Sequence, residues 1–134
     1  GSLAAAAGKA YRMAGIGDPA KDLDLAEVHD ITAYHELMAY EALGLAPEGG
    51  AGRLVDEGVT GMGGALPVNP SGGVLCANPY GAAGLIRAAE AALQLRGEAG
   101  QRQVSGARRA LAHGMSAPSG AAARTDCALI LEGG

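Results

Sequence analysis

The residues best suited to chemistry surround a glycine-rich run. Residues 68–84 lead into a predicted helix start at about Gly81–Ala82. Free backbone N–H groups and the helix dipole favour negative charge at such a start. Asn78 and Tyr80 lie just before it, where a side chain can meet a developing anion. The alternative interpretation is that these glycines only solve a packing problem.

His29 is the strongest titratable candidate, because it directly follows a predicted buried strand. The alternative is a strand-end histidine bonded to a backbone carbonyl. His35 and Glu36 are adjacent and point in different directions on a helix, so we interpret them as solvated residues rather than a dyad. His113 fits a satisfied core histidine, and Asp30 fits a cap on the helix that follows it.

Hydrophobic periodicity predicts the elements that position these residues. We expect helices near 3–15, 33–44 and 82–96, the second capped by Thr32 and the third with Leu85 and Ile86 at core spacing. Strands are expected near 23–28, 72–77, 107–113 and 126–131, the last two as an antiparallel pair. Helices that alternate with strands imply an α/β layer structure with helices on both faces of the sheet. The glycine-rich stretch 47–73 is long for a mere connection, which favours a functional loop.

Composition bounds the class of protein. The 134 residues contain 23 Gly, no Phe and no Trp, and 49% are hydrophobic. They fit one domain whose core of small side chains needs a larger partner surface for stability. The net charge of −4 argues against nucleic acid as a partner. No stretch is apolar enough to predict a membrane span. Two cysteines make neither a disulfide framework nor a metal site, so we expect a cytoplasmic protein.

Several separate motifs, in the right order, resemble the C-terminal half of the thiolase superfamily. Its pattern N-x-x-G-G-x-x-x-x-x-H-P-x-G-A-x-G is matched by Asn69, Gly72, Gly73 and the run N-P-Y-G-A-A-G at 78–84. Residues 24–30 (D-L-A-E-V-H-D) are similar to the V-H-D-x-F-T segment of sterol-carrier-type and archaeal-type members. The stretches 40–45, 52–58 and 106–113 continue the match.

The resemblance implies an α/β thiolase-fold half-domain over residues 1–134, with a mixed five-stranded sheet between helices and the N-terminal half absent. Members join two such halves and form homodimers. They make or break a carbon–carbon bond beside a coenzyme A thioester, which is a substrate, with no tightly bound cofactor or metal. By this resemblance Gly72, Gly73 and Gly81 bind substrate, and His29 donates an N–H to an oxyanion or its water.

Two departures from the family pattern concern catalysis. Asn78 replaces the histidine that accepts a proton from the nucleophilic cysteine, and an amide cannot act as that base. Ser116 stands where many thiolases place a second cysteine. Some thiolase-like proteins are instead retro-aldolases that use tyrosines and pair with a small zinc-ribbon/OB-fold protein. Tyr80 is then a candidate acid or base; alternatively its ring only packs over the loop.

Two functions from different classes follow. One is an enzyme half-domain acting on acyl-CoA by retro-aldol or degenerate thiolase chemistry. The other is a non-catalytic thiolase-like module that binds acyl-CoA, a lipid or a protein partner. In the first case His29, Asn78, Tyr80 and Ser116 are expected to converge on one concavity at the strand ends.

Overall fold

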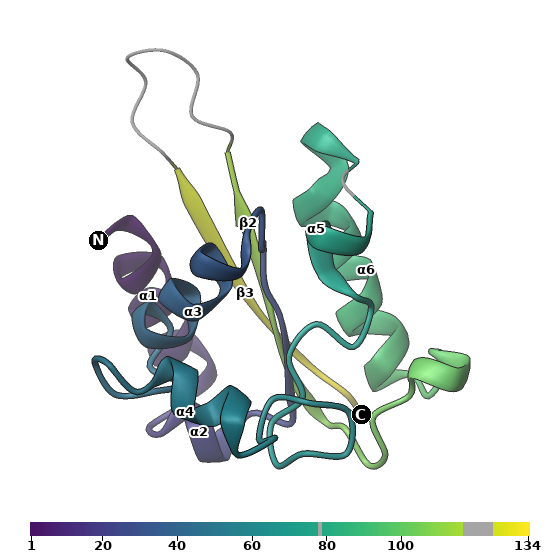
Figure 1. Cartoon of the computed structure of the whole chain (residues 1–134). Helices are drawn as coiled ribbons and strands as arrows, with labels where there is room; N and C mark the ends of the chain where they lie inside the picture. The colour runs from purple at the N-terminus through teal and green to yellow at the C-terminus, as the bar shows by residue number, and fades with distance from the viewer. Residues whose placement is uncertain (78, 117–124) are drawn as a thin grey trace.

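The computed structural model describes residues 1–77, 79–116 and 125–134. Two helices come before the first strand, a long helical stretch separates it from the second, and two consecutive strands end the chain (Figure 1). Their bounds are α1 Ser2–Ala14, α2 Pro19–Asp22, β1 Leu25–Glu27, α3 Ala33–Ala42, α4 Ala51–Asp56, α5 Gly73–Cys76, the 3-10 turn η1 Tyr80–Ala82, α6 Ala83–Leu95, the 3-10 turn η2 Gly100–Arg102, β2 Arg109–Met115 and β3 Asp126–Glu132. The helices predicted over 3–15, 33–44 and 82–96 are confirmed as α1, α3 and α6.

A mixed sheet in the order β1-β2-β3 forms the centre of the molecule. β1 runs parallel to β2, with Leu25 opposite Ala110, and β2 pairs with β3 in the predicted antiparallel arrangement. α1 and α3 lie on one side of the sheet and α6 on the other (Figure 1). The described residues form three strands rather than the five predicted. Val68 adds a single parallel bridge to Ala26.

The strand predicted near 72–77 is wrong, because this segment contains the short helix α5. Gly72 and Gly73 have positive φ values of 92° and 67°, which turn the chain out of an extended path. The Asp30 carboxylate then accepts the Val74 N–H at 2.6 Å. Asp30 therefore caps α5 rather than the helix that follows it in sequence. Thr32 caps α3 as predicted, accepting the His35 N–H at 3.3 Å.

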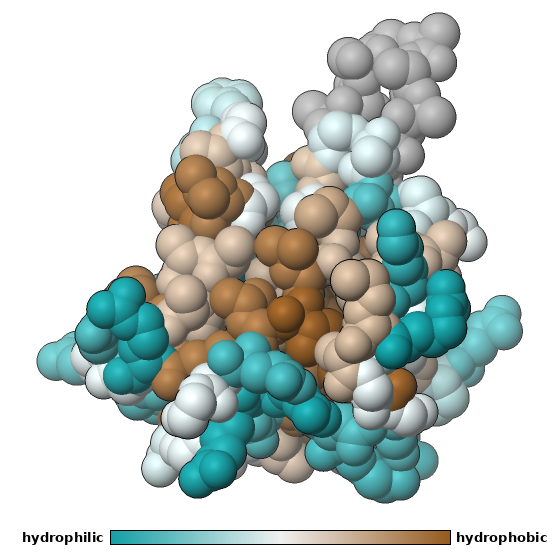
Figure 2. Space-filling view, turned by 180° about the vertical axis from the view of Figure 1, so that it is seen from behind, coloured by the Kyte–Doolittle hydropathy of each residue, from teal (hydrophilic) through white to brown (hydrophobic). Residues whose placement is uncertain are grey.

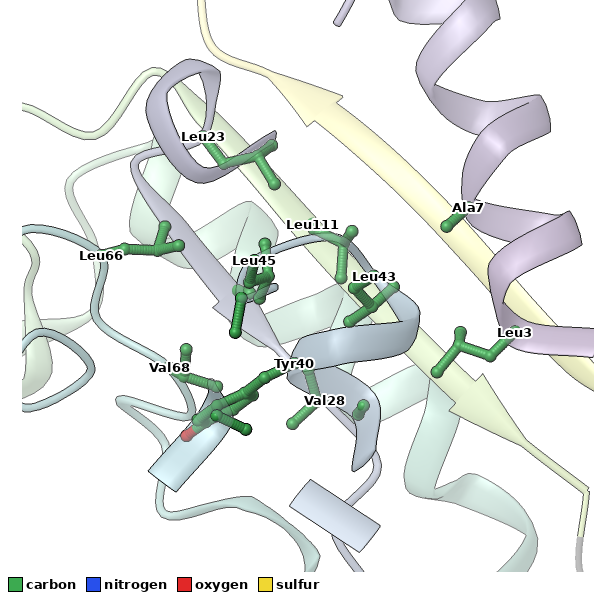
Figure 3. Packing of buried hydrophobic residues seen from close by; sticks show 14 residues of the cluster. Leu3, Ala7, Leu23, Val28, Tyr40, Leu43, Leu45, Leu66, Val68 and Leu111 are labelled. Carbon is green, nitrogen blue, oxygen red and sulfur yellow. The ribbon is translucent and has the colours of Figure 1, made fainter. Parts of the chain in front are cut away.

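The larger hydrophobic core lies between the sheet and α1 and α3 (Figure 3). Its side chains come from nearly every element on that side, and aliphatic residues dominate, as the composition requires. Tyr40 is its largest buried side chain. The labelled members are Leu3, Ala7, Leu23, Val28, Tyr40, Leu43, Leu45, Leu66, Val68 and Leu111. On α3, however, Tyr34 and Met38 are exposed.

The predicted core face of α6 is also wrong. Leu85 is 74% and Ile86 40% exposed, whereas Arg87, Glu90 and Gln94 are buried against the sheet. The buried face of α6 thus mixes polar side chains with Ala83 and Ala91, while Leu85 and Ile86 point outward, unlike an ordinary surface helix. No helix in the described part of the chain is both long and apolar enough to cross a membrane.

Candidate active site

A cavity of about 460 Å³ opens where β1 and β2 end and α6 begins. Three of the four residues predicted to converge, His29, Tyr80 and Ser116, line it. The fourth, Asn78, lies outside the described residues. The remaining lining residues are Ile31, Gly81, Gly84 and Met115. The fold therefore brings three segments that are far apart in sequence to one concavity.

The His29 imidazole has a defined protonation pattern. Its Nδ1 accepts the backbone N–H of Met115 at 3.3 Å, so in the neutral ring the proton lies on Nε2. Burial lowers the pKa of His29, and this effect exceeds that of the neighbouring Asp30 carboxylate, which raises it. The site thus favours a neutral ring that keeps one N–H donor, the state needed to bind an oxyanion without delivering a full charge.

Tyr80 begins the turn that leads into α6. Its φ of 54° lies in the left-handed region, which is uncommon for a tyrosine and costs about 1–3 kcal/mol. Tyr80 is 85% exposed and lines the cavity. A strained backbone that presents a phenol at a cavity is a feature typical of functional sites.

Ser116 lies at the end of β2. Its Oγ accepts the Thr125 N–H at 2.9 Å, and its own N–H donates to the Thr125 carbonyl at 2.9 Å. These two bonds clamp the strand ends together. The oxygen already accepts one bond, and among the described contacts the hydroxyl has no partner base. Ser116 fits a positioning or donor role better than that of a base.

The three predicted substrate-binding glycines separate into two groups. Gly81 lines the cavity at the start of α6. Gly72 and Gly73 instead serve packing: a Cβ on Gly73 would lie 2.3 Å from the Asp30 carboxylate. A Cβ on Gly72 would lie 2.7 Å from Cys76 Sγ. The absence of a side chain on Gly73 lets Asp30 reach the amide of Val74, which anchors the segment before Tyr80.

Sequence reasoning missed two glycines that shape the cavity. A Cβ on Gly84 would lie 3.2 Å from Gly114 Cα, and the converse distance is also 3.2 Å. α6 therefore approaches β2 at backbone contact, and Ile31 and Met115 complete the wall. The spacing of Gly81 and Gly84, one helical turn apart, was the available signal for a glycine-lined helix face.

A buried charged cluster lies beside the site, between β1 and α6. The Arg87 Nε is 3.3 Å from Glu27 Oε2, and both side chains are almost fully buried. Ser71 donates its N–H and its hydroxyl to Glu27 at 3.0 and 2.7 Å. Burial raises the pKa of Glu27, and the Ser71 bonds and Arg87 oppose that rise. The signal for this cluster was the spacing of Arg87, Glu90 and Gln94 on one helix face.

Glu36 is also not the solvated residue predicted. Tyr40 donates to its Oε1 at 2.9 Å and Asn69 at 3.5 Å, and burial raises its pKa. Asn69 in turn accepts the Val28 N–H at 2.7 Å. The Asn69 of the family pattern therefore ties the glycine-rich segment to the end of β1.

Comparison with known proteins shows which family this chain belongs to. The family model described as thiolase C-terminal domain-like matches residues 1–132. The chain belongs to this thiolase family. Sterol carrier protein 2 of Rattus norvegicus is 50% identical over 111 residues, covering 82% of this chain and 20% of the relative. An acetyl-CoA acetyltransferase of Methanothermobacter thermautotrophicus is 44% identical over 119 residues, covering 88% and 30%.

A solved structure, the Ltp2-ChsH2(DUF35) aldolase, shares the thiolase-like fold. It superposes with a TM-score of 0.81 at 27% identity, covering 98% of this chain and 31% of that one. The chain thus spans between a fifth and a third of the length of these relatives. It corresponds to one thiolase-like C-terminal domain of a kind found within larger proteins.

Proposed function

We propose that this domain supplies one side of an active site that breaks a carbon–carbon bond next to an acyl-CoA thioester. The observation that carries this proposal is the shared cavity of His29, Tyr80 and Ser116, in which the Met115 N–H fixes the proton of neutral His29 on Nε2. A neutral N–H donor beside a phenol suits a reaction that passes through an enolate oxyanion.

In the retro-aldol direction the substrate is a β-hydroxyacyl-CoA. Tyr80, acting as its phenolate, accepts the proton of the β-hydroxyl group, either directly or through a water. The Cα–Cβ bond breaks, a carbonyl compound leaves, and the electron pair passes into the thioester enolate. The His29 N–H stabilises the enolate oxygen, and a proton returned to Cα completes the acyl-CoA product. No oxidant or reductant is needed.

Asn78 favours cleavage over thiolase condensation. Thiolase condensation needs a base to activate the cysteine thiol, and an amide has no such state near neutral pH. The fold match to a structure named as an aldolase supports the same choice. Cys76 and Cys127 do not line the cavity, so a nucleophilic cysteine would have to come from another part of the protein.

The outward faces of the domain support a covalently joined or associated partner half. Leu85 and Ile86 expose an apolar stripe on α6. Seen from behind, hydrophobic residues gather in the middle of the surface (Figure 2). α1 and β3 line a groove of about 670 Å³ that includes Met13 and Leu129. We infer that an N-terminal thiolase half covers such surfaces, and homodimer formation and a zinc-ribbon/OB-fold partner belong to the same proposal.

The second candidate is a non-catalytic module that binds acyl-CoA or lipid. It is favoured by the replacement of the catalytic histidine by Asn78. A relative named non-specific lipid-transfer protein-like 2, from Caenorhabditis elegans, is 42% identical over 93 residues. The apolar side chains of Ile31 and Met115 in the cavity wall suit such a ligand.

An assay of the whole protein on two substrates separates these functions. We expect cleavage of β-hydroxyacyl-CoA and no brisk formation of acetoacetyl-CoA. Tyr80→Phe removes only the phenolic hydroxyl and should lower cleavage by about 10²–10⁴-fold. Tyr34→Phe is the matched control, because Tyr34 is 80% exposed on α3 and does not line the cavity.

Three results would count against this enzyme. An unaltered cleavage rate in Tyr80→Phe would exclude the phenol from acid–base work. Rapid condensation by the parent protein would contradict the argument from Asn78. Tight acyl-CoA binding without turnover would favour the binding module. Asn78→His is expected to restore some condensation if the rest of the protein carries a nucleophilic cysteine.

A further inference from the structure

A second histidine holds the backbone of His29 in place. The His29 N–H donates to His113 Nδ1 at 3.3 Å, while the Met115 N–H donates to His29 Nδ1 at 3.3 Å. The ring centroids of the two histidines are 6.3 Å apart. β2 thus contacts His29 twice. The His113 side chain binds the backbone N–H of His29, and the backbone N–H of Met115 binds the His29 ring.

The protonation of His113 follows from its partners. Its Nδ1 accepts a bond from His29, so the neutral ring carries its proton on Nε2. That Nε2 lies 3.1 Å from Asp126 Oδ1, and both side chains are almost fully buried. The other carboxylate oxygen of Asp126 accepts the Ser2 hydroxyl at the start of α1.

We propose that the Asp126–His113 pair is a positioning device for His29. The carboxylate holds His113 with its proton on Nε2, and this leaves the Nδ1 lone pair for the His29 N–H. The end of β1 is thereby fixed where Met115 can reach the His29 ring and set its proton on Nε2. The importance of this pair for catalysis rests on the proposed donor role of His29. Its effect on the position and tautomer of His29 does not depend on that role.

The strand register places these side chains together for a simple reason. His113 is opposite Ala128, and Asp126 is two residues away on β3. Diagonal neighbours of this kind lie on one face of a sheet. A small Ala128 leaves room for the His113 ring to reach Asp126. An aliphatic side chain would fill the same space on this otherwise hydrophobic face, so core filling alone does not explain the pair.

The test compares variants of the whole protein by two readouts. His113→Leu removes the acceptor and should accelerate hydrogen exchange of the His29 amide. It should also give a mixed His29 tautomer in long-range ¹H–¹⁵N spectra. His113→Asn keeps an acceptor oxygen near the Nδ1 position and should preserve both signals. Leu111→Val is the control, because it disturbs the same strand without touching His29.

Cleavage activity gives the second readout. We expect kcat to fall by about 10- to 100-fold in His113→Leu, since small misplacement of a reacting group has that effect, and to recover in His113→Asn. Asp126→Ala should show the same spectroscopic change and serves if His113→Leu does not fold.

The outcomes separate the two proposals. Unchanged His29 exchange and tautomer in folded His113→Leu or Asp126→Ala overturn the positioning device. Equal loss of both signals in His113→Asn also overturns it, because the acceptor would then not be the relevant group. A parent protein without cleavage activity contradicts the proposed function alone, while the spectra still decide the coupling between His113 and His29.

Discussion

The two faces of the central sheet are built from different kinds of residue. On the side of α1 and α3, Ala26 of β1, Val28 just after it and Leu111 of β2 contribute to a large aliphatic core. On the side of α6, the buried apolar cluster consists of Leu25 and three alanines, beside the charged Glu27, Arg87 and Glu90. Because side chains alternate along a strand, one short sequence serves both faces.

The α1/α3 face of the sheet contributes mainly to the stability of the fold, whereas the α6 face lies beside the candidate active site. Large apolar side chains exclude water and hold α1 and α3 on the sheet. Small residues, with Gly84 against Gly114, let α6 approach closely and leave room for polar groups near the cavity. The Arg87 Nε and Nη1 atoms find no hydrogen-bond partner among the described residues. The α6 face is therefore the less relaxed of the two.

Among changes on the α6 face, breaking the buried Glu27–Arg87 ion pair should lower the free energy of unfolding the most. Arg87→Met leaves Glu27 buried without its counter-charge and should lower the unfolding free energy by about 3–5 kcal/mol. Urea denaturation measures it. The double variant with Glu27→Leu should recover most of the loss. A single variant as stable as the parent would show that the pair is not needed.

The next largest loss of stability is expected from a side chain at Gly73, which would collide with the Asp30 carboxylate. Gly73→Ala adds a Cβ 2.3 Å from the carboxylate at a φ of 67°, and we expect a loss of about 2–5 kcal/mol. Gly58→Ala has a φ of 71° and nothing within 4 Å, so it should cost only about 1–2 kcal/mol. Thermal unfolding compares them, and equal losses would contradict the role given to Asp30.

The raised pKa of Glu27 predicts a pH effect of smaller size. The folded state keeps a proton that the unfolded chain has already lost, so this contribution to stability is full below the ordinary glutamate pKa. It is lost as the pH rises through the raised pKa. Glu27→Gln should flatten that fall in unfolding free energy, measured by denaturation from acidic to neutral pH. Glu57→Gln, at an exposed position, should follow the parent curve; a parallel curve for Glu27→Gln would contradict the prediction.

The smallest effect is expected on the outer face of α6. Leu85→Gln should change the stability of this chain by no more than about 0.5 kcal/mol, because the side chain is 74% exposed. In the whole protein the same change should weaken the contact with a partner half. Denaturation of both forms checks this, and a large loss in the 134-residue chain would show that α6 packs its apolar stripe inward.

Local patterns in the sequence predicted most elements of the fold. The helices at 3–15 and 82–96, the antiparallel pair of β2 and β3 and the Thr32 cap follow from periodicity and capping chemistry. The strand at 72–77 failed because the path of that segment depends on Asp30, more than 40 residues away, rather than on its own apolar residues. The core face of α6 failed because periodicity locates an apolar stripe but not the surface that covers it.

The site was predictable where side chains follow strand ends. His29, Tyr80 and Ser116 lie after β1, before α6 and after β2, and such positions meet at one edge of an α/β sheet. The His113–Asp126 pair could not be foreseen, since it depends on the register of β2 against β3. Register is a property of the folded sheet, which the spacing of two residues 13 apart does not reveal.

One measurement tests directly whether the cavity beside α6 carries the chemistry. In the whole protein, His29→Leu removes the N–H donor, and cleavage of β-hydroxyacyl-CoA should fall by about 10²–10³-fold. His29→Asn keeps an amide donor and should retain part of the rate, while Leu111→Val on the other face should lower stability and leave kcat unchanged. Cleavage by His29→Leu at the rate of the parent protein would contradict the account.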